Sequence, residues 1–86
     1  MSPWRVVLSA PATHDLRRLD RQVSGRITAA IQRLADENLG DVKKLKGREN
    51  RWRLRVGDWR VIFARDTQAR EIVVLEVGSR GGAYRD

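Results

Sequence analysis

The chain has 86 residues, with 18 Lys and Arg against 11 Asp and Glu, which gives a formal net charge of +7. This length allows one small domain, residues 1–86, with a thin hydrophobic core. The absence of cysteine and the single histidine exclude a disulfide framework and a cysteine- or histidine-rich metal centre, so we expect no metal or other cofactor. Hydrophobic residues make up 41%, too many for a disordered basic tail.

The first half of the chain predicts a strand followed by two helices. Residues 4–8 contain the tryptophan and β-branched residues typical of a short strand. Ser9 and Pro11 indicate the start of a helix, because a serine side chain caps free N–H groups and proline is tolerated in the first turn. Asp20 is expected to cap a second helix, whose apolar positions from Val23 to Leu34 follow the helical period. Gly40 is expected to end that helix, and the short connection predicts a helical hairpin.

After Gly40 the pattern changes to that of strands. Residues 41–50 are polar and are predicted to form a loop. From Arg51 to Val56 arginines alternate with apolar residues, as in a half-buried strand. Two further strands are expected at residues 59–64 and 71–77, separated by turns. The predicted fold class is α+β, with a helical hairpin packed on one face of a small, mostly antiparallel sheet in the order β-α-α-β-β-β.

The positive charge is concentrated in one part of the chain. Residues 43–65 contain nine basic and two acidic side chains, a balance of +7, and the remaining nine basic and nine acidic side chains cancel. Because the helices cover only one face of the sheet, the alternation predicts Arg51, Arg53 and Arg55 on the open face. A local cationic surface is typical of a site for a polyanion such as nucleic acid. The simpler alternative is a solvated sheet surface.

Three segments resemble the RelE/ParE superfamily of bacterial toxins. They are Lys44 to Gly47, Trp52 to Phe63, and Val77 to Arg80 with Tyr84 beyond it. The resemblance extends over nearly the whole chain and implies the toxin of a type II toxin–antitoxin pair. The RelE-like branch implies a metal-independent, ribosome-dependent endoribonuclease that cuts mRNA and inhibits translation. The ParE-like branch implies instead an inhibitor of DNA gyrase without nuclease activity.

The resemblance also implies the residues of a site. Catalytic roles fall on the four arginines and the tyrosine that match the nuclease pattern: Arg53, Arg55, Arg60, Arg80 and Tyr84. Phosphate binding falls on the basic residues around them: Lys43, Lys44, Lys46, Arg48 and Arg51. The best-known nuclease of the superfamily has lysine where this chain has Arg53 and Arg55. A guanidinium hardly loses its proton, so the identity of the general base is open, with Tyr84 as the remaining candidate.

A partner is implied as well. The resemblance implies a cognate, RelB-like antitoxin that covers the basic face in a heteromeric complex, besides the ribosome and mRNA. The sequence shows neither a signal-peptide pattern nor a long apolar segment, so we expect a cytoplasmic protein without membrane contacts. A third interpretation is a basic RNA- or DNA-binding module without toxicity.

Overall fold

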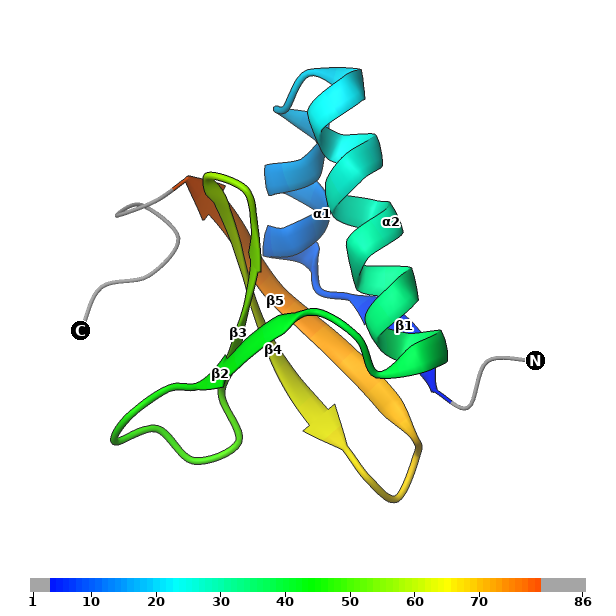
Figure 1. The fold of residues 1–86 in the computed structure, drawn as a ribbon, viewed down its shortest axis with the longest axis vertical. Helices are drawn as coiled ribbons and strands as arrows, with labels where there is room; N and C mark the ends of the chain where they lie inside the picture. Colours follow the sequence, from blue (N-terminus) through cyan, green and yellow to red (C-terminus); the bar gives the residue numbers. More distant parts are fainter. Residues whose placement is uncertain (1–3, 80–86) are drawn as a thin grey trace.

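The computed structural model describes residues 4–79, in which one strand and two helices are followed by four strands (Figure 1). The elements are β1 (Arg5–Leu8), α1 (Ala10–Arg17), α2 (Arg21–Glu37), β2 (Asp41–Lys44), β3 (Trp52–Val56), β4 (Trp59–Asp66) and β5 (Glu71–Ser79). The strands form one sheet in the order β1-β5-β4-β3-β2. β1 runs parallel to β5, and all other neighbours are antiparallel. Both helices lie on the same side of this sheet, so the predicted α+β fold class is confirmed.

The structure differs from the sequence prediction at residues 41–44. We predicted a loop there, but these residues form β2, an edge strand that pairs with β3 from Asp41 opposite Arg55 to Lys44 opposite Trp52. Only Val42 of this strand packs against the core. Charged residues are typical of edge strands, whose outer side faces solvent, but they hide the alternation that marks a half-buried strand. The pairing with β3 therefore defines this strand.

Side-chain caps fix the beginnings of both helices. Ser9 Oγ accepts a hydrogen bond from the backbone N–H of Ala12 at 3.1 Å, and Asp20 Oδ1 accepts one from Gln22 at 2.9 Å. Both caps were predicted. α2 ends earlier than predicted, because Asn38 and not Gly40 adopts the left-handed conformation that closes it, with φ of 56°. Neither described helix is long and apolar enough to cross a membrane.

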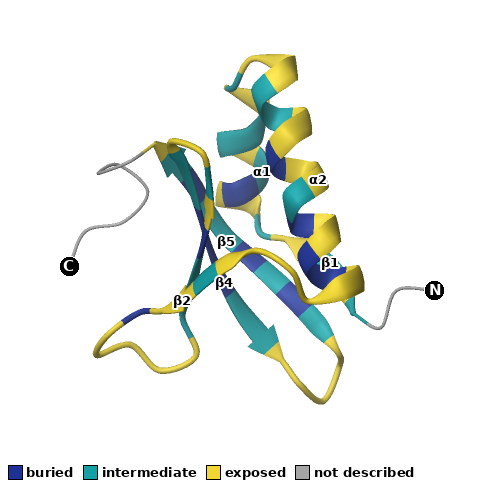
Figure 2. Cartoon of the chain, viewed as in Figure 1, coloured by how far each residue is buried: buried dark blue, intermediate teal, exposed yellow. Residues whose placement is uncertain are grey.

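The core lies between the helical hairpin and one face of the sheet (Figure 2). Its large buried side chains come mainly from α2 and the central strands and include Ile27, Ile31, Leu34, Leu54, Val61, Phe63 and Val74. Trp52 and Val56 pack against this core, as the alternation in β3 predicted. The arginines that alternate with them therefore lie on the opposite face, which the helices leave open.

The turn into β2 depends on a glycine. Gly40 has φ of +147°, and a Cβ atom there would lie 2.8 Å from Cδ1 of Leu54, which is buried in the core. Gly40→Ala is therefore expected to lower the free energy of unfolding by about 1–3 kcal/mol. The matched control is Gly25→Ala in α2, where nothing lies within 4 Å of the added atom. Because alanine favours the helix, we expect a gain of about 0.5–1 kcal/mol there. Urea denaturation measures both, and equal shifts would contradict the packing at Gly40.

Candidate nucleic-acid interface

The open face of the sheet brings together four of the predicted site residues. In the strand register, Lys43 lies opposite Arg53, and Arg55 lies opposite Arg60. Side chains directly opposite one another in neighbouring strands share a face of the sheet. The core residues Leu54 and Val61 alternate with these basic residues and point toward the helices. Three neighbouring strands, β2, β3 and β4, therefore present cations on the side away from the hairpin.

Arg53 lies at the centre of this group. Only 15% of its side chain is exposed, and its Nη2 lies 3.6 Å from Oδ1 of Asp41 on β2. The Nε of Arg53 is buried and finds no hydrogen-bond acceptor among the residues that the structure describes. A buried N–H without an acceptor costs free energy, which an incoming oxygen would relieve. This guanidinium is thus held in place at one end and can donate to a phosphate at the other.

Arg55 and Arg60 flank the turn between β3 and β4. Arg55 is exposed, and its Nε donates a hydrogen bond to the carbonyl oxygen of Gly57 at 3.2 Å, which braces the side chain along the turn. Arg60 is half-buried and lies opposite Gly78 of β5. Gly78 contributes no side chain next to Arg60 on that strand.

Lys44 lies on the other side of the sheet from Arg53. It is opposite Trp52, and its Nζ is 5.8 Å from the centroid of the Trp52 ring. Arg65 lies over the same ring at 4.9 Å. These cation–π contacts cover the aromatic end of the core. The phosphate-binding role predicted for Lys44 stays a prediction, and any such contact would lie outside the open face.

The remaining predicted phosphate-binding residues belong to the segment between β2 and β3. Lys46 and Arg48 are exposed there, and Arg51 is half-buried at its end. The segment is held on β4 by Asn50, whose amide N–H donates to the carbonyl oxygen of Arg65 at 2.9 Å. The amide oxygen of Asn50 accepts from the N–H of Arg65 at 3.0 Å. The side chain thus imitates one more step of strand pairing and fixes the position of the basic loop.

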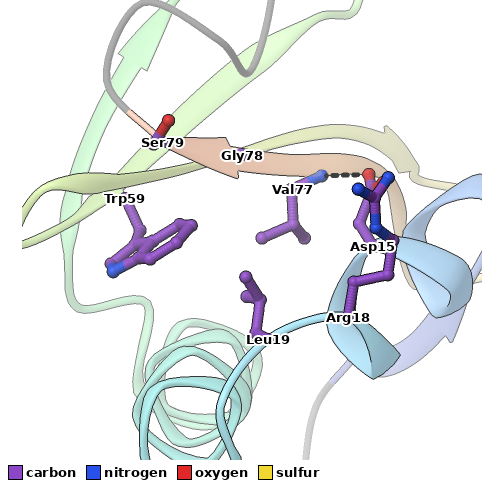
Figure 3. A pocket seen from close by; sticks show the side chains of 7 residues that line it. All are labelled: Asp15, Arg18, Leu19, Trp59, Val77, Gly78 and Ser79. Carbon is purple, nitrogen blue, oxygen red and sulfur yellow. Dashed lines mark hydrogen bonds between the residues drawn. The ribbon is translucent and has the colours of Figure 1, made fainter.

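The two other predicted catalytic residues, Arg80 and Tyr84, lie outside the described residues. The strand that leads to them is anchored by α1. β1 ends at Leu8 opposite Val74, and beyond this point Asp15 Oδ2 accepts from the N–H of Val77 at 3.0 Å (Figure 3). Asp15 also lines a pocket of about 430 Å³ together with Arg18, Leu19, Trp59, Val77, Gly78 and Ser79. The helix therefore supplies the acceptor that the end of β5 lacks.

Comparison with known proteins assigns the family. The model of the family described as "ParE toxin of type II toxin-antitoxin system, parDE" matches residues 6–84. The chain belongs to the ParE toxin family. As a member, it is a toxin of a type II toxin–antitoxin system. No curated protein matches the sequence significantly.

Solved structures similar to this ParE-family toxin include several RelE toxins and a YoeB/ParE toxin from Agrobacterium tumefaciens. The RelBE2 toxin–antitoxin complex of Mycobacterium tuberculosis matches with a TM-score of 0.79 and 28% identity, over 93% of this chain and 94% of that one. The RelE–RelB complex of Pyrococcus horikoshii OT3 matches with a TM-score of 0.77 and 28% identity, over 94% and 99% of the two chains. The isolated E. coli RelE toxin has 16% identity and a TM-score of 0.71, over 96% and 87%, and shares the fold.

Two residues on the open face of the toxin were missed by the sequence analysis. Ile62 lies opposite Arg53 and is only 1% exposed, although it is not part of the core under the helices. Glu76 lies opposite Ile62 on β5. The open face is therefore not uniformly cationic: an apolar side chain and a carboxylate stand beside the arginines. The available signal was the spacing of Ile72, Val74 and Val77, which breaks strict alternation and indicates a bulge before Glu76.

Proposed function

We propose that this ParE-family toxin is a ribosome-dependent mRNA endoribonuclease that inhibits translation. The observation that carries the proposal is the group of Lys43, Arg53, Arg55 and Arg60 on the sheet face that the helices leave uncovered. Fold alone does not decide between the activities found in this superfamily, so the proposal rests on the chemistry of that face.

Cleavage of RNA without a metal requires three tasks. The 2′-oxygen attacks the adjacent phosphorus, which yields a 2′,3′-cyclic phosphate and a free 5′-OH. One group must accept the 2′-OH proton, one must stabilise the charge on the phosphate oxygens, and one must protonate the leaving oxygen. Arg53 and Arg60 suit the second task, because a guanidinium stays charged and donates two parallel hydrogen bonds to a phosphate. Arg80 is assigned to the same task, and Tyr84 to stacking or proton transfer.

Basic residues outside this group are assigned to non-specific phosphate binding. Lys46 and Arg48 in the exposed loop, with Arg51 at its end, extend the cationic surface beyond the catalytic arginines. Such contacts position a nucleic acid without reading its sequence. We therefore propose that this loop holds RNA of the ribosome or the message next to the catalytic face.

The partner of the toxin is proposed to be a RelB-like antitoxin. The support is the likeness to toxins solved in RelBE complexes. A basic surface attracts an acidic or amphipathic chain by electrostatic complementarity. In the resulting heteromeric complex the antitoxin covers the open face, and both proteins act in the cytoplasm, where ribosomes are found.

The test of the proposal is a reconstituted translation reaction. Purified toxin is added, and the 5′ ends of the mRNA are mapped by primer extension. We expect cuts within codons positioned in the ribosomal A site and no cuts in mRNA without ribosomes. Normal translation with intact mRNA would refute the proposal.

A second candidate function is inhibition of DNA gyrase. The observation that favours it is the family model itself, which describes ParE toxins. A protein of this kind binds its target and needs no cleavage chemistry. Inhibition of gyrase supercoiling in a reaction where the same protein leaves mRNA intact would establish this second function in place of the first.

A further inference from the structure

Within the described part of the chain, one carboxylate on the cationic face has no partner. Glu76 lies opposite Ile62 on β4, and Ile62 lies opposite Arg53 on β3. Glu76 and Arg53 are therefore two strand spacings apart, about 10 Å between their backbones. Gly78, next on the same face of β5, lies opposite Arg60. The carboxylate thus borders the surface that two arginines frame.

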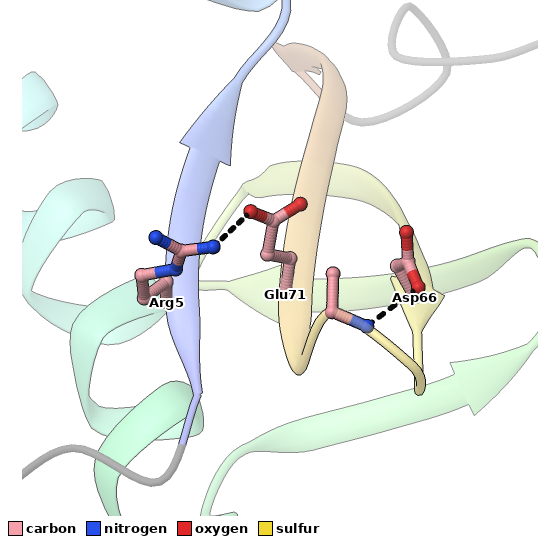
Figure 4. A network of polar contacts seen from close by, with 4 residues as sticks. Arg5, Asp66 and Glu71 are labelled. Carbon is pink, nitrogen blue, oxygen red and sulfur yellow. Dashed lines mark hydrogen bonds and ion pairs between the residues drawn. The ribbon is translucent and has the colours of Figure 1, made fainter.

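Glu76 differs from the other acidic side chains on this face, because each of those has a partner. Asp41, at the edge of the sheet, is 60% exposed and lies 3.6 Å from Arg53. At the opposite end of the sheet, Glu71 binds Arg5 at 2.8 Å and Asp66 accepts from Ala69 at 3.0 Å (Figure 4). Glu76 is half-buried and, among residues 4–79, has no hydrogen-bond or ion-pair partner.

We propose that Glu76 is the general base of the RNA cleavage reaction. The inference rests on the proposed function. It supplies a proton acceptor, which the arginines cannot provide because a guanidinium does not give up its proton in a protein. Carboxylates are among the side chains that commonly accept protons in such transition states. Glu76 lies on β5 beside the strand that carries Arg60, so its carboxylate would border a phosphate, with its neighbouring 2′-OH, held by Arg53 and Arg60.

The step balances as follows. The bond between the 2′-oxygen and phosphorus forms while the bond between phosphorus and the 5′-oxygen breaks. The 2′-OH proton passes to the carboxylate of Glu76, and the leaving 5′-oxygen takes a proton from water. The products are a 2′,3′-cyclic phosphate and a 5′-OH. Glu76 then returns its proton to solvent.

Glu76→Gln tests the proposal against Glu71→Gln. Both variants remove one negative charge from β5, but Glu71 lies at the far end of the sheet, paired with Arg5. In single-turnover cleavage on programmed ribosomes, we expect the rate constant of Glu76→Gln to fall at least about 100-fold. The toxin concentration for half-maximal rate should stay the same or fall, because the cationic face gains one unit of charge. The acidic limb of the pH–rate profile should disappear, whereas Glu71→Gln should keep both the rate and the limb.

The outcomes of this experiment distinguish a failure of the proposed nuclease function from a failure of the role assigned to Glu76. If the unmodified toxin cuts mRNA and Glu76→Gln cuts within about threefold of its rate with the same acidic limb, Glu76 is not the base and the nuclease function stands. If the unmodified toxin does not cut, the function and the assignment of Glu76 both fail. Circular dichroism checks that the variants are folded. Should Glu76→Gln unfold, Glu76→Asp replaces it: a reduced rate with a retained acidic limb supports the base, and an unchanged rate overturns it.

Discussion

Arg60→Ala is expected to reduce mRNA cleavage about 10²–10³-fold or more, since it removes a donor aimed at the charge that develops on the phosphate. Arg60 is half-buried on the open face between Arg55 on β3 and Gly78 on β5, so it lies next to a residue assigned to the reaction. Arg60→Lys keeps the charge but loses the two parallel hydrogen bonds, and an intermediate rate is expected. The measurement is the rate of mRNA cutting on programmed ribosomes.

The control for Arg60→Ala is Arg33→Ala. It also removes one positive charge, but Arg33 is exposed on α2, where it forms an ion pair with Glu37 at 3.8 Å. Exposed pairs of this kind contribute little to stability, and we expect cleavage at the rate of the unmodified toxin. Equal cleavage by the two variants would show that the open face is not the catalytic surface, and thermal melting of both proteins would exclude unfolding as the cause.

Phe63→Ala is expected to lower the free energy of unfolding by about 3–5 kcal/mol. The Phe63 side chain is fully buried, opposite Trp52 on β3 and Val74 on β5, and lies under Arg65. A domain of this length has a total stability of about 4–13 kcal/mol. The variant should therefore be largely unfolded at moderate urea concentrations where the unmodified toxin is still folded.

The control for Phe63→Ala is Phe63→Leu, which fills most of the same volume and should cost much less. Urea titrations followed by circular dichroism give both values. A loss below about 1 kcal/mol for Phe63→Ala would mean that the centre of the sheet is less tightly packed than the burial of Phe63 implies. Comparing Phe63→Ala with Phe63→Leu also distinguishes activity that is lost through unfolding from activity that is lost by changing the open face.

The sequence predicted those elements whose own residues carry a clear signal. Ser9 and Asp20 are capping residues at the expected positions, and each helix begins at the residue directly after its cap. In β3, apolar Trp52, Leu54 and Val56 alternate with arginines, so the face that receives Arg53 and Arg55 could be assigned before the structure was known. These signals are local, because a cap or a period of two depends on neighbours in the chain.

The sides of the sheet on which Lys43 and Lys44 lie could not be predicted. Both belong to a polar segment without alternation, and only pairing with β3 turns one lysine to the open face and the other toward Trp52. A charged edge strand gains its structure from a partner that is distant in the chain. In the sequence Lys43 and Lys44 look equivalent, whereas the fold places them on opposite sides of the sheet.

The same limit explains why Glu76 was missed. Ile72 and Val74 face the core, and strict alternation from them would send Glu76 into the core and Val77 to the open face. The register shift between Ile62 and Phe63 leaves Leu75 as an extra residue in β5 and reverses both assignments.

Four features could be predicted from the chain alone: the helical hairpin, the alternating strand, the concentration of charge in residues 43–65 and the resemblance to toxins. Tertiary structure decided which charges meet. The physical reason is that side-chain direction in a sheet is set by pairing between strands, and one bulge changes the side on which every later residue of the strand lies.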